Sequence, residues 1–189
     1  MSTLLRAAAT TEDVQAYRNA PLFAVSLPKF VVMSVCTLGL YEFYWCYRHW
    51  QAERRREEEN LSPFWRTVFA PVWVFALLPR IQSLTTKHGV PATWSATGLA
   101  LAFLLLNAAW RLPDPVWLVC LLTCLPLIPV QQSVNRLNAT LVPEAGRNDR
   151  FSGLNVLFIV IGTILLLLLL LSLLFPESQN AQSPQHVAA

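Results

Sequence analysis

The chain has 189 residues, of which 54% are hydrophobic and only 13% are charged, whereas an ordinary soluble domain has about 25% charged residues. The mean hydropathy is +0.44, and a soluble fold of this length cannot hide so much apolar surface, so a bilayer is the expected solvent. The formal net charge is only +3, and the basic residues lie between apolar runs, which favours a membrane surface over a nucleic-acid partner. The sequence therefore predicts an all-α integral membrane protein.

The first 28 residues are interpreted as a polar N-terminal arm. Residues 1–20 lack the apolar core of about seven to fifteen residues that a signal peptide requires. The arm leads into an apolar segment at residues 30–47, which runs directly into the charged stretch ERRREEEN at residues 53–60. We interpret this region as one continuous helix that crosses the bilayer and extends into solvent to about Asn60.

The next apolar run, residues 67–79, is bounded by Arg66 and Arg80. It spans only about 20 Å, against a hydrocarbon core of about 30 Å, and it contains Pro71 and Pro79. A re-entrant helix, an interfacial helix and a fifth span with snorkelling arginines all remain open. If the run does not cross, the arginines and lysines concentrate on one side of the membrane, and the positive-inside rule then favours four spans with both termini outside.

Three further spans are predicted, at residues 93–110, 116–130 and 154–175. Asp114 and Pro115, which lie between Trp110 and Trp117, indicate a tight turn at the membrane surface between two of them. Beyond residue 130 the apolar residues continue at helical spacing with polar residues between them, which predicts an amphipathic extension. The polar tail at residues 176–189 is expected to be disordered, so residues 29–175 form a single helical membrane domain.

Glu42 is a carboxylate inside an apolar segment, and such residues usually face the bundle interior and find a partner there. Positions i, i+4, i+7 and i+11 share one helix face, and they define a stripe that consists of Glu42, Cys46, His49 and Glu53. Two interpretations stay open: a proton or cation site at Glu42, and a polar seam that packs against a neighbouring helix. The stripe is about 16 Å long and no HExxH or paired CxxC pattern occurs, so we predict no metal site, no cofactor and no catalytic centre.

Two further groups of residues are assigned structural roles. The interfacial anchors are expected to be aromatic, because their rings favour the headgroup level, and they are Tyr41, Tyr44, Trp45, Tyr47, Trp50, Trp110 and Trp117. Gly98 and Ala102 form a small-xxx-small pair that allows close helix packing, either within the chain or between two copies of it.

One combination of motifs is distinctive. Leu-Gly-Leu-Tyr is followed by Tyr-Trp, Tyr and a basic residue, at positions Leu38, Gly39, Leu40, Tyr41, Tyr44, Trp45, Tyr47 and Arg48. This pattern resembles the first-helix signature of a family of uncharacterised bacterial inner-membrane proteins. The stretches NLSPFWR (60–66), WRLPDPVW (110–117) and LPLIPVQ (125–131) also look like relatives of that kind, so the resemblance covers about residues 26–175. The family has no assigned activity, and the resemblance implies a bacterial inner-membrane location and nothing catalytic.

These observations predict a non-enzymatic polytopic membrane protein that scaffolds or binds other membrane components. The alternative is a small transporter or channel subunit that uses Glu42 as an intramembrane polar site. The expected partners are the lipid bilayer and either another membrane protein or a second copy of the chain, with no nucleic acid.

Overall fold

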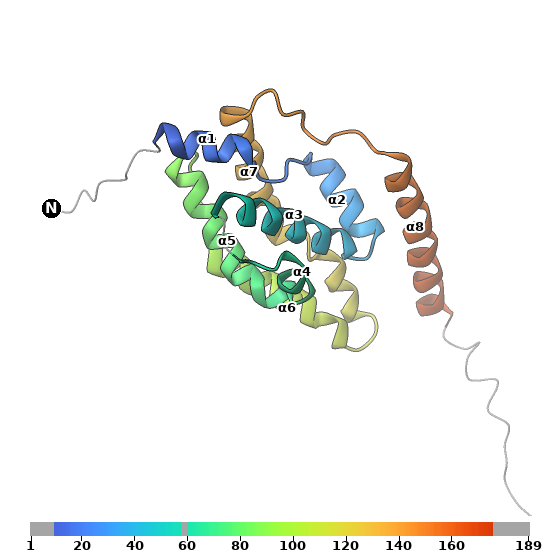
Figure 1. The fold of residues 1–189 in the computed structure, drawn as a ribbon. Coiled ribbons are helices and arrows are strands. Elements are labelled where there is room, and N and C mark those ends of the chain that lie inside the picture. Colours follow the sequence, from blue (N-terminus) through green and yellow to red (C-terminus); the bar gives the residue numbers. More distant parts are fainter. Residues whose placement is uncertain (1–9, 58–59, 176–189) are drawn as a thin grey trace, which may run out of the picture.

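The structure is a computed structural model that describes residues 10–57 and 60–175 (Figure 1). The first nine residues of the predicted arm and the predicted tail at residues 176–189 lie outside the described residues. Within them the only β-type pairing is an isolated parallel bridge between Val25 and Asn148. The regular elements in chain order are α1 (Thr11–Asn19), α2 (Leu27–Cys36), α3 (Leu40–Glu57), α4 (Pro63–Val68), α5 (Ala70–Lys87), α6 (Ala96–Ala108), η1 (Ala109–Arg111), η2 (Val116–Leu122), η3 (Leu125–Leu127), α7 (Ile128–Leu141) and α8 (Gly153–Leu174).

The all-helical architecture was predicted, but the prediction of four clear spans is wrong. Within the described part of the chain, two helices are long and apolar enough to cross a membrane. One is the continuous run Val116–Leu141, which joins η2, η3 and α7 in 26 residues, and the other is Gly153–Leu174 with 22 residues. The predicted span at 116–130 falls within the first of these helices, and the one at 154–175 matches the second except for residue 175. The helices in the predicted spans at 30–47 and 93–110 do not reach the required length.

The segment at 30–47 is interrupted by a tight turn. Helix α2 ends at Cys36 and α3 begins at Leu40, and between them Leu38 and Gly39 have positive φ values of 51° and 87°. A left-handed conformation carries no steric penalty for glycine, and the Gly39 N–H closes the turn by donating to the Ser34 carbonyl at 2.8 Å. The predicted continuous span-to-surface helix is therefore two helices with a reversal of direction between them.

The two helices form a hairpin whose open ends lie together. The α3 side chains reach back to the segment that precedes α2, because Arg48 stacks on the Phe23 ring at 4.9 Å and Arg56 Nη1 donates to the Ala20 carbonyl at 3.4 Å. Figure 1 shows α2 and α3 side by side, with the turn at one end. Residues on either side of the predicted span thus lie at the same end of the molecule.

The other predicted spans are shortened by their local chemistry. Helix α6 begins after Ser95, whose hydroxyl accepts from the Gly98 N–H at 3.2 Å, and its 13 residues cover only about 20 Å before the chain tightens into η1. The short apolar run at 67–79 is divided between α4 and α5. The break between the two helices is at Phe69, and Pro71 lies in the first turn of α5. Helix α4 begins at Pro63, and α5 ends at Lys87 just before Gly89, whose φ is +80°.

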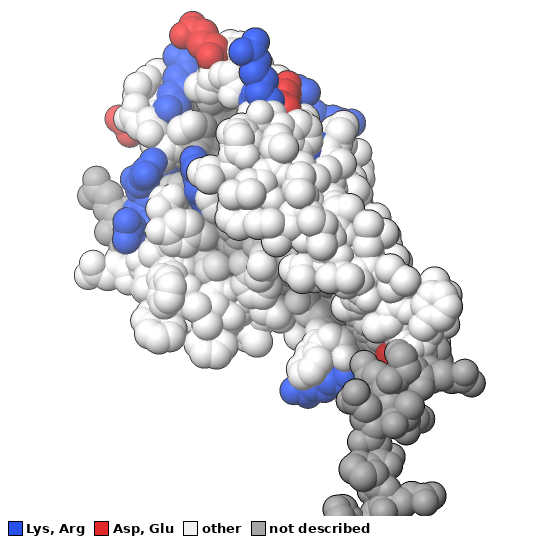
Figure 2. Space-filling view, turned by 90° about the vertical axis from the view of Figure 1, so that its right-hand side faces the viewer, with Lys and Arg blue, Asp and Glu red and all other residues white. Residues whose placement is uncertain are grey.

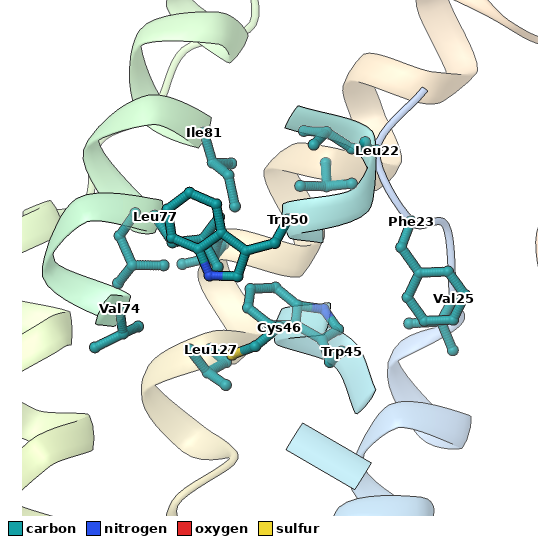
Figure 3. Packing of buried hydrophobic residues seen from close by; sticks show 14 of the residues in the cluster. Leu22, Phe23, Val25, Trp45, Cys46, Trp50, Val74, Leu77, Ile81 and Leu127 are labelled. Atoms are coloured by element: carbon teal, nitrogen blue, oxygen red, sulfur yellow. The ribbon is translucent and has the colours of Figure 1, made fainter. Parts of the chain in front are cut away.

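The core lies on the buried face of α3 (Figure 3). Trp50 points toward α5 between Leu77 and Ile81, while Cys46 lies against Leu127. Trp45 completes this layer and is fully buried. The hairpin is therefore anchored by large side chains that enter the interior.

Residues 10–28, interpreted from the sequence as part of a polar arm, pack against the bundle. Thr10 caps α1 through a reciprocal pair of hydrogen bonds with Asp13, and Asp13 pairs with Lys87 at 2.7 Å. The Lys87 ammonium and the Thr10 cap hold the pKa of Asp13 at about 2. Tyr17, Val25 and their apolar neighbours are buried in the same core as α3, so this segment is an integral part of the fold.

Helix α8 stands at the edge of the bundle beside α2 (Figure 1). Gly162 is its one buried residue, and a Cβ added there would lie 1.5 Å from the Cys36 carbonyl oxygen. This glycine lets the α8 backbone touch the end of α2. Figure 2, which views the molecule from the α8 side, shows a broad uncharged face with charged side chains mainly toward one end and a small group at the opposite end.

Candidate functional site

All four residues of the predicted stripe lie on the buried face of α3. Glu42, Cys46, His49 and Glu53 are each no more than 2% exposed. Helical spacing alone thus located a common face, and the structure adds the partners that meet it.

Glu42 meets the helical run at Val116–Leu141. The Thr123 hydroxyl donates to Glu42 Oε1 at 2.8 Å, and both side chains are buried. This contact joins the hairpin to one of the two candidate membrane helices. A single neutral donor can hold either a protonated or an ionised carboxyl group in place, so the arrangement has the features of a structural hydrogen bond.

His49 is enclosed by rings. Its imidazole lies 4.1 Å from the Trp45 ring centroid and 6.4 Å from that of Phe23. Neither ring nitrogen has a hydrogen-bond partner among the residues that the structure describes. Burial, and to a smaller extent the charges of Arg56 and Arg48, lower the pKa of His49 to about 3 against the opposing effect of the nearby Gln131 amide. The imidazole is therefore neutral at physiological pH and sits in an apolar pocket.

The other two stripe residues are also locked in place. Burial raises the pKa of the Cys46 thiol well above its usual range, so this cysteine stays protonated and unreactive. Glu53 forms an ion pair with Arg56 one turn later, and Arg56 also lies over the Tyr17 ring at 5.7 Å. The stripe ends in a charge pair that holds α3 against α1.

Trp45, which is next to the stripe on α3, meets a row of amide side chains on α7. The sequence interpretation treated this row only as the polar side of an amphipathic extension. Gln131 accepts from Trp45 Nε1 at 2.5 Å and donates to the Phe23 and Val25 carbonyls at 3.2 and 3.4 Å. Asn135 donates to the same Val25 carbonyl at 2.8 Å. Gln131, Asn135 and Asn138 stand at i, i+4 and i+7. This spacing is the feature of the sequence that could have revealed a row of amide side chains on one face of the helix.

Asn138 completes this row, which we call the amide ladder: Gln131, Asn135 and Asn138. It donates to the Leu22 carbonyl at 3.0 Å and accepts from the Tyr17 hydroxyl at 2.5 Å. An extended segment in an apolar core needs partners for its carbonyl groups, and the ladder supplies them for Leu22, Phe23 and Val25. The ladder and the stripe together clamp the N-terminal segment between α3 and α7.

The chemistry available at this site is limited. In the described portion of the chain, no group of three or more His, Cys, Asp or Glu side chains is arranged to hold a metal ion. Glu42 and His49 lie two turns apart on α3 and each packs against its own partners. The stripe joins helices through individual side-chain contacts.

The predicted interfacial anchors fall into two groups. Trp45 and Trp50 are almost completely buried and Tyr41 is buried as well, whereas Tyr44 and Trp110 are exposed and Tyr47 and Trp117 are half-buried. Trp50 forms a cluster with Trp73, and Arg66 stacks at 4.5 Å on each of their rings. Trp117 donates to the Asp114 carboxylate at 2.7 Å, which braces the turn before η2.

The predicted close-packing pair, Gly98 and Ala102, does not lie at a close helix contact of the kind that Gly162 makes. Gly98 is exposed, and a Cβ there would meet only the Ser95 side chain of the same helix end. Ala102 is half-buried. The sequence feature that could have indicated close packing at Gly162 is its position as a single glycine within the long apolar run at 154–175.

A cavity of about 950 Å³ lies between α8 and the hairpin of α2 and α3. Its apolar lining includes Met33, Leu40 and Phe158, and one part of its wall is polar, with Lys29 and Asn155. Glu42, Cys46, His49 and Glu53 do not line it. The cavity and the stripe are therefore separate features of the hairpin.

Comparison of the chain with protein families, with curated proteins and with solved structures finds no match.

Proposed function

We propose that this chain is an integral membrane protein without a catalytic centre, which scaffolds other membrane components. The observation that carries the proposal is α8, a 22-residue helix with a mean hydropathy of 3.2 along which Gly162 is the one buried residue. A water-exposed helix of this composition would be strongly unfavourable, whereas a bilayer or a membrane partner solvates it. The rest of the fold supports α8 through one narrow contact with α2.

The proposed location is the bacterial inner membrane, and it rests on the resemblance of residues 26–175 described above. The distribution of charge supports an orientation. Three contacts join the ends of several helices. They are the Asp13–Lys87 ion pair, the bond from Arg18 to the Leu141 carbonyl at 3.1 Å and the bond from Lys29 to Asn148 at 2.8 Å. We call this the basic end, and we propose that it faces the cytoplasm.

The location of Glu42 does not favour the alternative of a transport site. Glu42 is held by Thr123 and does not line the cavity beside α8. A transport pathway needs polar groups along a continuous aqueous route, whereas His49 lies against aromatic rings and Glu53 is paired with Arg56.

The test is site-specific photocrosslinking in bacterial cells that express the full-length chain. A photoreactive side chain replaces Leu157 or Leu168 on the exposed face of α8, and Phe103, which is fully buried in α6, is the matched control. We expect the protein to resist alkaline extraction from membranes, and the two α8 positions to trap a protein of discrete mass that the Phe103 position does not trap. Release by alkaline extraction, or crosslinks from α8 to lipid alone, would contradict the proposal.

A further inference from the structure

The cavity beside α8 has the size and the lining of a ligand site. Its volume of about 950 Å³ falls within the range of about 300–1,000 Å³ that is common for small-molecule pockets. The apolar part of the wall comes from Met33 on α2, Leu40 on α3, and Phe158, Ile161 and Leu165 on α8. An occupant of this part must be a hydrocarbon.

The polar part of the wall contains a buried cation. Lys29 is only 2% exposed, and its ammonium donates to Asn148 Oδ1 at 2.8 Å and to the Arg150 carbonyl at 2.6 Å. The Asn155 amide oxygen, once the amide is oriented to suit its donors, accepts from the same ammonium at 3.0 Å. All three acceptors are neutral.

The charge of Lys29 is therefore not neutralised locally. In residues 10–57 and 60–175, no carboxylate lies within ion-pair distance of its ammonium, and the Asp149 carboxylate acts on it only at longer range. The centroid of the Phe151 ring lies 5.6 Å from the ammonium. A buried charge without a counter-charge is unfavourable, so an anion that approaches from the cavity would be stabilised.

A cation at one part of an apolar cavity is complementary to a molecule with an anionic head and a hydrocarbon tail. We propose that the cavity binds one anionic phospholipid of the surrounding bilayer, with its phosphate near Lys29 and an acyl chain between α8 and the hairpin. This assignment rests on the membrane location proposed above. Basic pockets between membrane helices recognise anionic head groups in the same way, and Lys29 lies at the basic end, where the head groups of one leaflet lie.

The experiment measures lipid binding to the purified full-length protein in detergent by native mass spectrometry. Phosphatidylglycerol and phosphatidylcholine with identical acyl chains are added separately. One lysine near a membrane surface favours an anionic lipid by about fivefold, so we expect one tightly bound phosphatidylglycerol with about that preference over phosphatidylcholine. Glycerol phosphate, which has no acyl chain, is expected not to compete.

Four variants test the assignment. Lys29→Gln should abolish the preference, while Lys87→Gln removes the same charge from an exposed lysine at the same end and should leave the preference unchanged. Asp149→Asn should increase the preference, since it removes the negative charge that acts on Lys29 from position 149. Ile161→Trp should fill the cavity and weaken the binding of both lipids by at least tenfold.

Equal binding of the two lipids by the wild-type protein would overturn the proposal, and so would equal effects of Lys29→Gln and Lys87→Gln. Formation of a dimer that excludes lipid and is broken by Ile161→Trp would assign the cavity to a second copy of the chain and also overturn it. If Lys29→Gln does not fold, Asp149→Asn and Ile161→Trp decide, because both positions are exposed. Loss of lipid preference in a protein that still resists alkaline extraction rejects this site alone, whereas release from the membrane rejects the proposed function.

Discussion

His49 is a titratable group kept neutral by its surroundings. Its folded-state pKa of about 3 lies well below the ordinary value of 6.5, first because of burial and then because of the positive charges of Arg56 and Arg48. As the pH falls below 6.5, the unfolded chain binds a proton at this position and the folded chain does not. The stabilising contribution is therefore complete above pH 6.5 and is lost progressively as the pH falls toward 3.

We predict that acidification from pH 7.5 to 5.0 lowers the free energy of unfolding by about 2 kcal/mol through His49, which is 1.5 pH units at about 1.36 kcal/mol each. Thermal unfolding of the detergent-solubilised protein at the two pH values measures this. Glu42 acts in the opposite direction over this range, because burial raises its pKa to about 7, so the contribution of His49 is the difference between variants. His49→Leu should lose about 2 kcal/mol less stability on acidification than the wild type, whereas His88→Gln should stay closer to the wild type, because His88 is partly exposed. The same pH dependence in His49→Leu and the wild type would reject the assignment.

Gln131 is predicted to be among the most sensitive positions of the amide ladder. Gln131→Leu removes the partners of the Trp45 N–H and the Phe23 carbonyl, and each buried unpaired group costs about 1–3 kcal/mol. We expect a loss of about 2–4 kcal/mol in denaturant unfolding. Gln132→Leu, at the exposed neighbouring position, should change stability little, and comparable losses in the two variants would refute the ladder.

For single residues, the sequence predicted which side chains share a helix face but not which side chains they contact. The spacing from Glu42 to Glu53 correctly indicated one shared face of a helix, because helical periodicity is local information. The partners of Glu42 and Trp45 are Thr123 and Gln131, which lie 81 and 86 positions along the chain. No local pattern could pair them, and the ladder was therefore missed.

At the scale of elements, the main correction concerns the hairpin of α2 and α3. Hydropathy is continuous from residue 30 to residue 47, so it does not reveal the reversal at Leu38 and Gly39. Backbone conformation decides the outcome, since Gly39 adopts a positive φ without strain. Prediction of span number from apolar length fails where a glycine turn divides an apolar run.

The contact between α8 and α2 allows a direct test. Thr163 Oγ1 lies 3.8 Å from Cys36 Sγ, so Thr163→Cys should form an oxidant-induced disulfide with Cys36 in a protein whose other cysteines are replaced by alanine. Ile164→Cys, one position further and exposed, is the matched control and should not crosslink. The measurement is the mobility shift of the oxidised protein, reversed by reductant.

Gly162→Leu in the Thr163→Cys background should abolish the disulfide, because even a Cβ at position 162 would lie 1.5 Å from the Cys36 carbonyl oxygen. Efficient crosslinking in this double variant would mean that α8 approaches α2 in another way. Retained crosslinking together with normal membrane extraction would reject the role of Gly162 without affecting the membrane assignment.

For the whole molecule, the fold implies a topology that differs from the one expected from apolar length. Position 19 at the end of α1 and position 54 at the end of α3 lie at the basic end, where Arg56 contacts Ala20. Leu112 follows α6 and η1, in the turn before the helical run that leads back to α7. A spanning helix at 30–47 would instead place positions 19 and 54 on opposite sides.

We predict that Asn19→Cys, Arg54→Cys and Glu144→Cys are protected from a membrane-impermeant maleimide in intact bacterial cells, while Leu112→Cys is labelled. Each is introduced into a chain without its four native cysteines. Permeabilised cells provide the control, since all four positions are exposed and should then react. Labelling of position 19 but not of position 54 in intact cells would contradict the hairpin.

The amide ladder also constrains the order in which the chain folds. Its bonds join residues 17–25 to residues 131–138, across 106 to 121 positions of sequence. Contacts at such separation form late, after their distant partner has been synthesised. Until residues 131–138 have been synthesised, the Leu22, Phe23 and Val25 carbonyl groups lack the side-chain partners that hold them in the folded protein. The N-terminal segment is therefore expected to be among the last parts of the bundle to reach its native position.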